Sequence, residues 1–291
     1  MSETGLMPKI PANCTMIPAA VMDFVRSLPG PSALVGCRAG GQPFSCCEYD
    51  IAIFGHGTNS VVQIGAHAVE LLYVKDRVLE FGGIEVIKDS KSFSLSFRVK
   101  QATQEKRGKA LRAYGRKALV TSLMYQQRMK EVRRPLLASM WLKAGAYQFV
   151  RGALALAGER PMPTHELGQV RQAELGRMSE GAQVALECIG IERATRPAIA
   201  RSVKAVAELK SGDYDTRLAQ SKVDWLLEKS MLADCYYFLG RAACESLVSK
   251  NNAFHSKYGK LAQLALDLSA DQQGLEKLQK NLSRAAKKAL S

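Results

Sequence analysis

The stretch "LVGCRAGGQPFSCCEYDIAIFG" (residues 34–55) joins two short apolar runs through a loop of small residues. The first run ends in Gly-Cys-Arg. The second, "EYDIAIFG", alternates and is rich in β-branched and aromatic residues, which predicts a strand. Since successive side chains of a strand point to opposite faces, Glu48 and Asp50 are expected on the same face.

Two carboxylates on one face of a strand favour a divalent cation between them. Alone they repel each other, and oxygen ligands of this kind suit Mg²⁺ or Mn²⁺. Upstream, Gly36 and the loop after it would let backbone N–H groups approach an anion, and Arg38 would add positive charge. The stretch therefore predicts a site for a nucleoside triphosphate and its metal. The alternative is an exposed edge strand whose acids face water.

The combination "VGCRAGG" and "EYDIAIF" resembles the signature of the DNA polymerase β-type nucleotidyltransferase superfamily, in its minimal nucleotidyltransferase branch. That signature is a hydrophobic strand, Gly-Ser, a spacer, and Asp-x-Asp inside a second hydrophobic strand. A helix precedes the motif in the family, and the apolar spacing of residues 17–28 predicts one here. The third carboxylate of the family lies on the next long strand. Glu70 in "HAVELLYV" matches it best, and Glu85 in "GGIEVI" is the second choice.

The resemblance implies a metal-dependent nucleotidyltransferase. Its catalytic and metal-binding residues would be Glu48, Asp50 and Glu70, and its triphosphate-binding residues would be Gly36, Cys37 and Arg38. The implied reaction transfers a nucleoside monophosphate from a triphosphate, with ATP the expected donor, to an acceptor hydroxyl on RNA, protein or a small molecule. Pyrophosphate is released, and paired metal ions would stabilise the attacking and leaving oxygens.

The chain departs from the family signature at three positions. Cys37 replaces the serine and is a weak hydrogen-bond donor, while Glu48 and Glu70 are each one methylene longer than aspartate. These changes favour an alternative, in which the fold is catalytically degenerate and serves as a nucleotide-binding, RNA-binding or regulatory module.

Beyond about residue 98 the pattern becomes helical, so the expected fold class is α+β. A small mixed-sheet nucleotidyltransferase domain (1–100) would be followed by an all-α domain (101–291). Within 76–97, "GGIEVI" and the alternating "SFSLSF" are expected to form short strands, or a strand and a turn. Pro135 suits a first helical turn and Gly158 a C-terminal cap. The absence of proline after position 197 predicts long helices.

The expected helical domain resembles the HEPN-like or substrate-binding domains that accompany this branch. Within residues 147–170, Arg160 and His165 have the spacing of the HEPN ribonuclease motif, in which histidine acts as general acid or base and arginine stabilises the transition state. Pro161 departs from that motif, and His165 suits a helix start equally well. A ribonuclease is therefore a third functional hypothesis.

Charge is distributed unevenly over the 291 residues. The chain carries a net charge of +14, yet residues 1–97 hold 7 basic and 9 acidic side chains. Residues 98–134 hold 12 Lys and Arg against 2 Glu, with Tyr114 among them. Such a segment favours RNA or another polyanionic acceptor as partner, the alternative being a basic helix that faces water.

The location expected from the sequence is cytoplasmic. Apolar runs are too short to span a membrane, and the N-terminus has no pattern of a secretory signal. The seven cysteines have neither CxxC nor zinc-ribbon spacing, so we expect reduced thiols, with Cys46 and Cys47 not bonded to each other. The sequence predicts nothing about oligomeric state.

Overall fold

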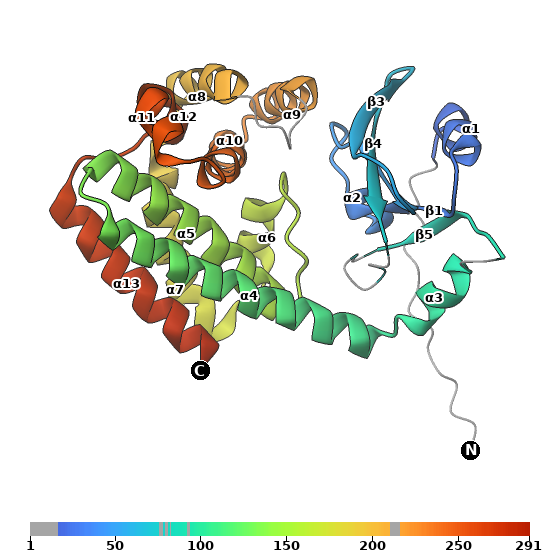
Figure 1. Cartoon of the computed structure of the whole chain (residues 1–291), viewed down its shortest axis with the longest axis horizontal. Coiled ribbons are helices and arrows are strands. Elements are labelled where there is room, and N and C mark those ends of the chain that lie inside the picture. Colours follow the sequence, from blue (N-terminus) through green and yellow to red (C-terminus); the bar gives the residue numbers. More distant parts are fainter. Residues whose placement is uncertain (1–16, 76–77, 79–80, 82, 92–93, 210–215) are drawn as a thin grey trace. The chain divides into compact units, whose positions relative to one another are not determined.

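A computed structural model describes residues 17–75, 78, 81, 83–91, 94–209 and 216–291. The chain forms two compact units, residues 1–104 and 105–291, which we call the sheet unit and the helical unit. The first is a small mixed sheet with helices and the second is all-helical, so the predicted α+β class is confirmed. Figure 1 labels the elements of both units.

The sheet unit contains a five-stranded sheet in the order β3-β4-β2-β1-β5. Only the β2–β4 pair is parallel; the other neighbours run antiparallel. The strands are β1 (Ser32–Val35), β2 (Tyr49–Phe54), β3 (Ser60–Ile64), β4 (His67–Val74) and β5 (Glu85–Lys88). The strands expected at "EYDIAIFG" and "HAVELLYV" are thus the two central parallel strands.

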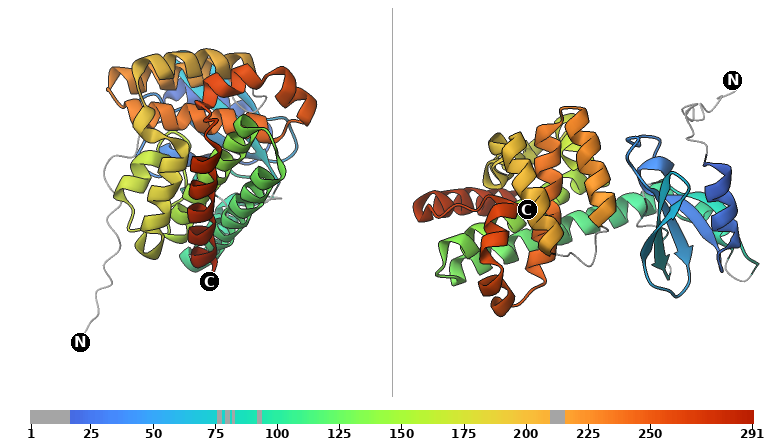
Figure 2. Two further views of the ribbon diagram at one scale, coloured as in Figure 1. Left: turned by 90° about the vertical axis from the view of Figure 1, so that its left-hand side faces the viewer. Right: turned by 90° about the horizontal axis from the view of Figure 1, so that it is seen from above.

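Each face of the sheet carries an apolar cluster that packs against a helix. The predicted N-terminal helix is α1 (Ala19–Ser27), and its Val21 and Val25 pack with Ile51 and other residues on one face. On the other face Ala33, Val35 and Ala52 pack with Leu95 of α3 (Leu95–Gln101). Figure 2 shows α1 beside the sheet from a second direction. Alternation along β2 therefore assigns Ile51 to the α1 face and Asp50 to the α3 face.

One local prediction for the sheet unit was wrong, and one strand was not predicted. Residues 95–97 of "SFSLSF" begin α3 instead of a strand. The carboxylate of Asp89 explains this start: its two oxygens accept hydrogen bonds from the backbone N–H groups of Leu95 (2.6 Å) and Ser96 (2.9 Å). These are donors that a helix start leaves unpaired, so the capping contact outweighs the alternating pattern. The strand β3 was not predicted, and it forms the edge of the sheet beside β4.

The helical unit is built around α5 (Pro135–Leu156), which is buried along most of its length. Pro135 occupies its first turn, as predicted, and Gly158 (φ 92°) follows its C-terminal end. The other helices are α4 (Gln104–Glu131), α6 (Glu166–Gln172), α7 (Ser179–Ile189), α8 (Arg196–Leu209), α9 (Thr216–Glu228), α10 (Leu232–Val248), α11 (Asn252–Lys257), α12 (Gly259–Leu266) and α13 (Gln272–Leu290), with 3₁₀ turns at η2 (Gly176–Met178) and η3 (Ile191–Arg193).

Small residues allow α4 and α5 to approach closely. A Cβ atom at Gly115 of α4 would lie 3.0 Å from the backbone oxygen of Gly152 on α5, and Ser122 donates a 2.7 Å hydrogen bond to the oxygen of Gly145.

Within the described parts of the chain, no helix combines the length and apolar composition needed to cross a bilayer.

The C-terminal helices are shorter than predicted, although no proline interrupts them. A turn containing Ser230 (φ 57°) separates α9 from α10, and Asp267 (φ 48°) ends α12. Left-handed backbone conformations stop a helix as effectively as proline, and aspartate tolerates them better than most residues. The absence of proline was therefore a poor guide to helix length.

Candidate metal centre

Three carboxylates meet on the α3 face of the sheet. Glu48, Asp50 and Glu70 each offer one oxygen atom, and these oxygens lie within 4.8 Å of one another. All three are residues that the sequence singled out as catalytic and metal-binding. The structure shows that they converge; their binding of a metal stays a prediction.

Strand register produces this convergence. Asp50 on β2 pairs directly with Glu70 on β4, so their side chains leave the same face of adjacent strands. Glu48 precedes β2 by one residue and shares the face of Asp50 by alternation. Glu85, the second choice for the third acid, lies on β5 opposite Leu34 of β1. Since β1 stands between β5 and β2, the register selects Glu70 over Glu85.

Gly36 is required by the carboxylate beside it. It follows β1 with φ 73°, and a Cβ atom there would lie 1.9 Å from Oδ2 of Asp50. Any side chain would thus collide with the carboxylate and would also strain the backbone. Gly36 begins the one-turn helix α2 (Gly36–Ala39), so the loop after β1 passes directly against Asp50. This close approach places backbone next to the acids, as a site for a charged ligand requires.

Arg38 braces the segment that leads into β2. Its Nε donates to the backbone oxygens of Cys47 (3.1 Å) and Glu48 (3.0 Å), and Nη2 also donates to Cys47. The guanidinium lies 4.1 Å from the ring centroid of Tyr49, a cation–π contact. Its predicted contact with a triphosphate is untested, but these bonds show that it positions the backbone of Glu48.

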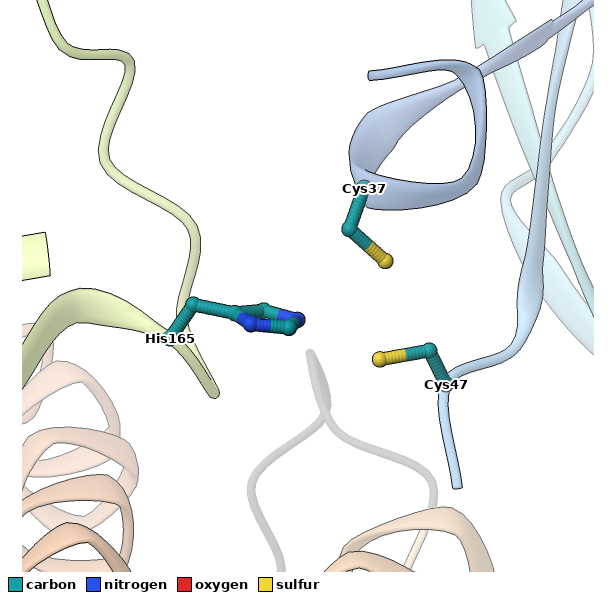
Figure 3. Close-up of side chains that lie close together, drawn as sticks. All are labelled: Cys37, Cys47 and His165. Atoms are coloured by element: carbon teal, nitrogen blue, oxygen red, sulfur yellow. The ribbon is translucent and has the colours of Figure 1, made fainter. Parts of the chain in front are cut away.

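Cys37 stands where the nucleotidyltransferases have serine, and its thiol is directed to a second thiol. Figure 3 shows the sulfur atoms of Cys37 and Cys47 facing each other, and they lie within 4.8 Å. The hydrogen bond to Cys47, burial and the nearby carboxylates of Asp50 and Glu48 raise the pKa of the Cys37 thiol. Cys37 is therefore a neutral thiol at pH 7. This pairing was not foreseen, since the sequence drew attention to the neighbours Cys46 and Cys47.

The donor set fits a hard divalent cation. Three carboxylate oxygens are ligands that Mg²⁺ and Mn²⁺ prefer. Oxygens bound to one Mg²⁺ at its usual bond length stand roughly 3–4 Å apart, so oxygens within 4.8 Å need only a small adjustment. Without a cation, two unit charges at that separation repel by roughly 3 kcal/mol at an effective dielectric constant of 20. Geometry and charge both favour a bound cation.

The predicted ribonuclease pair lies in the helical unit. His165 is the residue before α6, and its side chain makes no capping hydrogen bond there. The segment before it is held by Gln169, whose side chain donates to the oxygen of Arg160 (2.7 Å) and accepts from the N–H of Met162 (2.9 Å). The helix-start position predicted for His165 is confirmed, and a catalytic role stays a prediction.

A buried ion network in the helical unit escaped the sequence analysis. Glu166 is fully buried, pairs with Arg241 (3.0 Å) and Arg151 (3.8 Å), and accepts a hydrogen bond from Tyr237 (3.1 Å). Glu245 in turn contacts both arginines. These residues come from α5, α6 and α10 and show no local pattern, so only the tertiary structure reveals them.

The basic segment 98–134 falls mainly on α4. The exposed cations of α4 are Lys106, Lys109, Arg112, Arg116, Lys117, Arg128 and Lys130. Tyr114 is 39 % exposed among them. Cations and an accessible aromatic ring on one helix are compatible with a polyanionic partner, which stays a prediction.

Comparisons of the chain with protein-family models, curated proteins and solved structures find no match. The resemblance to nucleotidyltransferases therefore rests on the motif in residues 34–55 and on the geometry around it. The sheet, the three converging acids and the glycine against Asp50 are what carry any functional conclusion.

Proposed function

We propose that the sheet unit is a metal-dependent nucleotidyltransferase that transfers a nucleoside monophosphate from a triphosphate to an acceptor hydroxyl. The observation that carries this proposal is the convergence of Glu48, Asp50 and Glu70 within 4.8 Å. The loop that starts at Gly36 adds support because its backbone lies against Asp50. Neither feature is needed for an edge strand whose acids simply face water.

Each residue of the site would have its own role in the transfer reaction. Glu48, Asp50 and Glu70 would hold Mg²⁺ or Mn²⁺, which, when bound, offsets negative charge on the reacting phosphates. Gly36, which has no side chain, lets the backbone of the loop lie against Asp50, where it would contact the triphosphate, and Arg38 keeps the backbone of Glu48 in place. Glu70 would receive the proton of the acceptor hydroxyl. The acceptor oxygen bonds to the α-phosphorus, the bond from that phosphorus to the bridging oxygen breaks, and pyrophosphate leaves.

Metal binding is the first test. Free Mn²⁺ has a paramagnetic resonance signal that decreases on binding, so titration of the protein measures affinity without any assumption about substrate. We expect Mn²⁺ to bind and to be displaced by Mg²⁺, and we expect Asp50→Asn and Glu70→Gln each to weaken binding at least about tenfold. Glu85→Gln is the matched control, because Glu85 is an exposed acid of the same sheet outside the cluster.

Transfer is the second test. α-³²P-labelled ATP, GTP, CTP and UTP are incubated with Mg²⁺ or Mn²⁺ and with RNA, with the protein alone, or with small hydroxyl compounds. Labelled acceptor and released pyrophosphate should appear in equal amounts and disappear in Asp50→Asn. If wild-type protein binds no Mn²⁺, or if product forms equally in Asp50→Asn, the proposal is wrong.

A degenerate, nucleotide-binding module is the second candidate. The neutral Cys37 thiol, directed to Cys47 instead of a phosphate, and the longer side chains of Glu48 and Glu70 favour it. Metal-dependent binding of a nucleoside triphosphate without pyrophosphate release would support this module. RNA cleavage that persists in Asp50→Asn but disappears in His165→Ala would instead support the ribonuclease hypothesis.

A further inference from the structure

The helical unit contains a pocket that the nucleotidyltransferase proposal does not use. Its volume is about 430 Å³, within the range of small-molecule sites. It lies where α5 begins, beside α11 and α12, elements that can be followed in Figure 1. The buried side chains of Met140, Ala262 and Leu268 form part of its wall, and Leu136 and Leu137 extend the apolar surface.

The charged lining of this pocket is entirely basic. Arg133 and Arg134 line it, both are exposed, and no lining residue is acidic. Arg134 donates a 3.0 Å hydrogen bond from Nη1 to Ser256 Oγ of α11, which keeps its guanidinium at the pocket. The Nε2 atom of His255 lies 2.9 Å from the backbone oxygen of Leu247, while its buried Nδ1 has no hydrogen-bond partner among the described residues. An anionic group is therefore the charged ligand that this lining favours.

Two helix starts strengthen the preference for an anion. Leu136 in the first turn of α5 and Gly259 at the start of α12 both line the pocket. Neither helix has a capping side chain or an acidic residue in its first turn, so their first N–H groups add positive potential that no side chain offsets. The arginines and the helix starts thus act in the same direction.

From the apolar wall and the basic lining, we propose that this pocket binds a small amphipathic carboxylate, with its tail against Met140, Ala262 and Leu268 and its carboxylate at Arg133 and Arg134. A nucleotide fits less well, because the apolar wall offers no partners for the hydrogen-bonding edge of a base. The site shares no residue with the carboxylate cluster of the sheet unit, so each proposal can fail without the other.

Calorimetric titration with decanoate, below the concentration at which it forms micelles, tests the site. We expect binding at one site per chain, with 1-decanol at least about tenfold weaker because it lacks the charge-assisted contacts. Arg133→Gln combined with Arg134→Gln should remove this preference for decanoate. Arg201→Gln, an exposed cation on α8, is the matched control and should change nothing.

Gly259→Phe tests the position of the tail. A Cβ atom at Gly259 meets no atom within 4 Å, so the aromatic ring can enter the pocket without a backbone clash. We expect decanoate binding to fall at least about tenfold, whereas Gly168→Phe, at another open helical glycine, and Asp50→Asn should leave it unchanged. Leu137→Gln provides a second variant that weakens binding without filling the space.

Three results would overturn the proposal. If the wild-type protein does not bind decanoate, the proposed site does not exist. If decanoate and decanol bind with equal affinity, the pocket does not recognise the carboxylate. The third result is a protein that does not bind monomeric decanoate but binds anionic phospholipid vesicles, with an affinity that Gly259→Phe leaves unchanged. In that case the two arginines would contact a membrane surface and not a ligand in the pocket.

Discussion

The two units each contain a cluster of charged side chains, and the clusters are built on opposite principles. In the sheet unit, Glu48, Asp50 and Glu70 bring three like charges together. In the helical unit, Glu166 and Glu245 alternate with Arg151 and Arg241, so acids and bases are equal in number. Buried charges of opposite sign can satisfy one another, whereas clustered charges of one sign repel unless a cation, a proton or hydrogen bonds offset them.

The comparison contrasts a network that balances its own charges with a cluster that we propose to be functional. Burial raises the pKa of the Glu166 carboxyl, and Arg241 and Arg151 offset part of that rise. Removing one member of such a network should cost stability. Removing one acid of the sheet cluster should instead relieve repulsion and weaken metal binding. Four predictions test this contrast, from the largest expected effect to the smallest.

The largest effect is expected from Glu166→Gln. The change leaves Arg241, which is 4 % exposed, without its buried counter-charge, and breaking a buried pair typically costs about 3–5 kcal/mol of unfolding free energy. Both tryptophans, Trp141 and Trp225, belong to the helical unit, so their fluorescence during urea unfolding reports on this unit. The exposed Glu180→Gln should cost less than about 1 kcal/mol. Equal losses in the two variants would contradict a structural role for the network.

The next largest effect is expected from Gly36→Ala. It adds left-handed backbone strain of roughly 1–2 kcal/mol and a collision with Asp50 that brings the total loss to about 3 kcal/mol. Gly41 also has a positive φ (77°) but open space around it, so Gly41→Ala measures the strain alone. Amide hydrogen exchange of β1 and β2 gives the stability. In an Asp50→Ala background, Gly36→Ala and Gly41→Ala should cost the same unfolding free energy. A difference that persists would mean that the collision at Gly36 is not with the Asp50 side chain.

A smaller effect of opposite sign is expected from Glu70→Gln. In the presence of a chelator the variant should stabilise β2 and β4 by about 1 kcal/mol at low salt, and the gain should shrink as salt screens the repulsion. Millimolar Mg²⁺ should stabilise the wild-type sheet unit and leave the variant unchanged. Hydrogen exchange with and without Mg²⁺ measures both effects. If Glu70→Gln destabilises the sheet in the absence of metal, contacts within the protein stabilise the three carboxylates, and the expected repulsion between them is contradicted.

The smallest effect is expected from Asp89→Ala, at a carboxylate that stabilises a helix start instead of a cluster. Hydrogen bonds from the backbone and side chain of Ser96 lower the pKa of Asp89 to about 2. The folded state therefore binds fewer protons than the unfolded state between about pH 4 and 2, so this stabilisation is complete above pH 4 and disappears as pH falls through 2. The variant should lose about 0.5 kcal/mol at pH 7 and nothing at pH 2, as measured by exchange in α3. Asp23→Ala, at an exposed position of α1, is the control and should leave exchange in α3 unchanged at pH 7.

Much of the sheet unit could be predicted from local pattern. The alternation of residues 48–54 assigned Glu48 and Asp50 to one face, and the apolar run around Glu70 identified the partner strand. The errors have local causes that the pattern does not contain. Asp89 caps α3 from outside the helix, and β3 forms because β4 offers it an edge. In the helical unit, Ser230 and Asp267 end helices through backbone conformation, which composition does not reveal.

The sequence by itself determined which residues are the candidates for metal binding, because residue type and alternation are local properties. Glu48, Asp50 and Gly36 could be selected without knowledge of any partner. Only the tertiary structure decided that Glu70, and not Glu85, completes the cluster, because parallel register between β2 and β4 is a long-range property. The same holds for Glu166 with Arg241 and for the pocket at the start of α5, whose members are distant in sequence and meet only after the helices have packed.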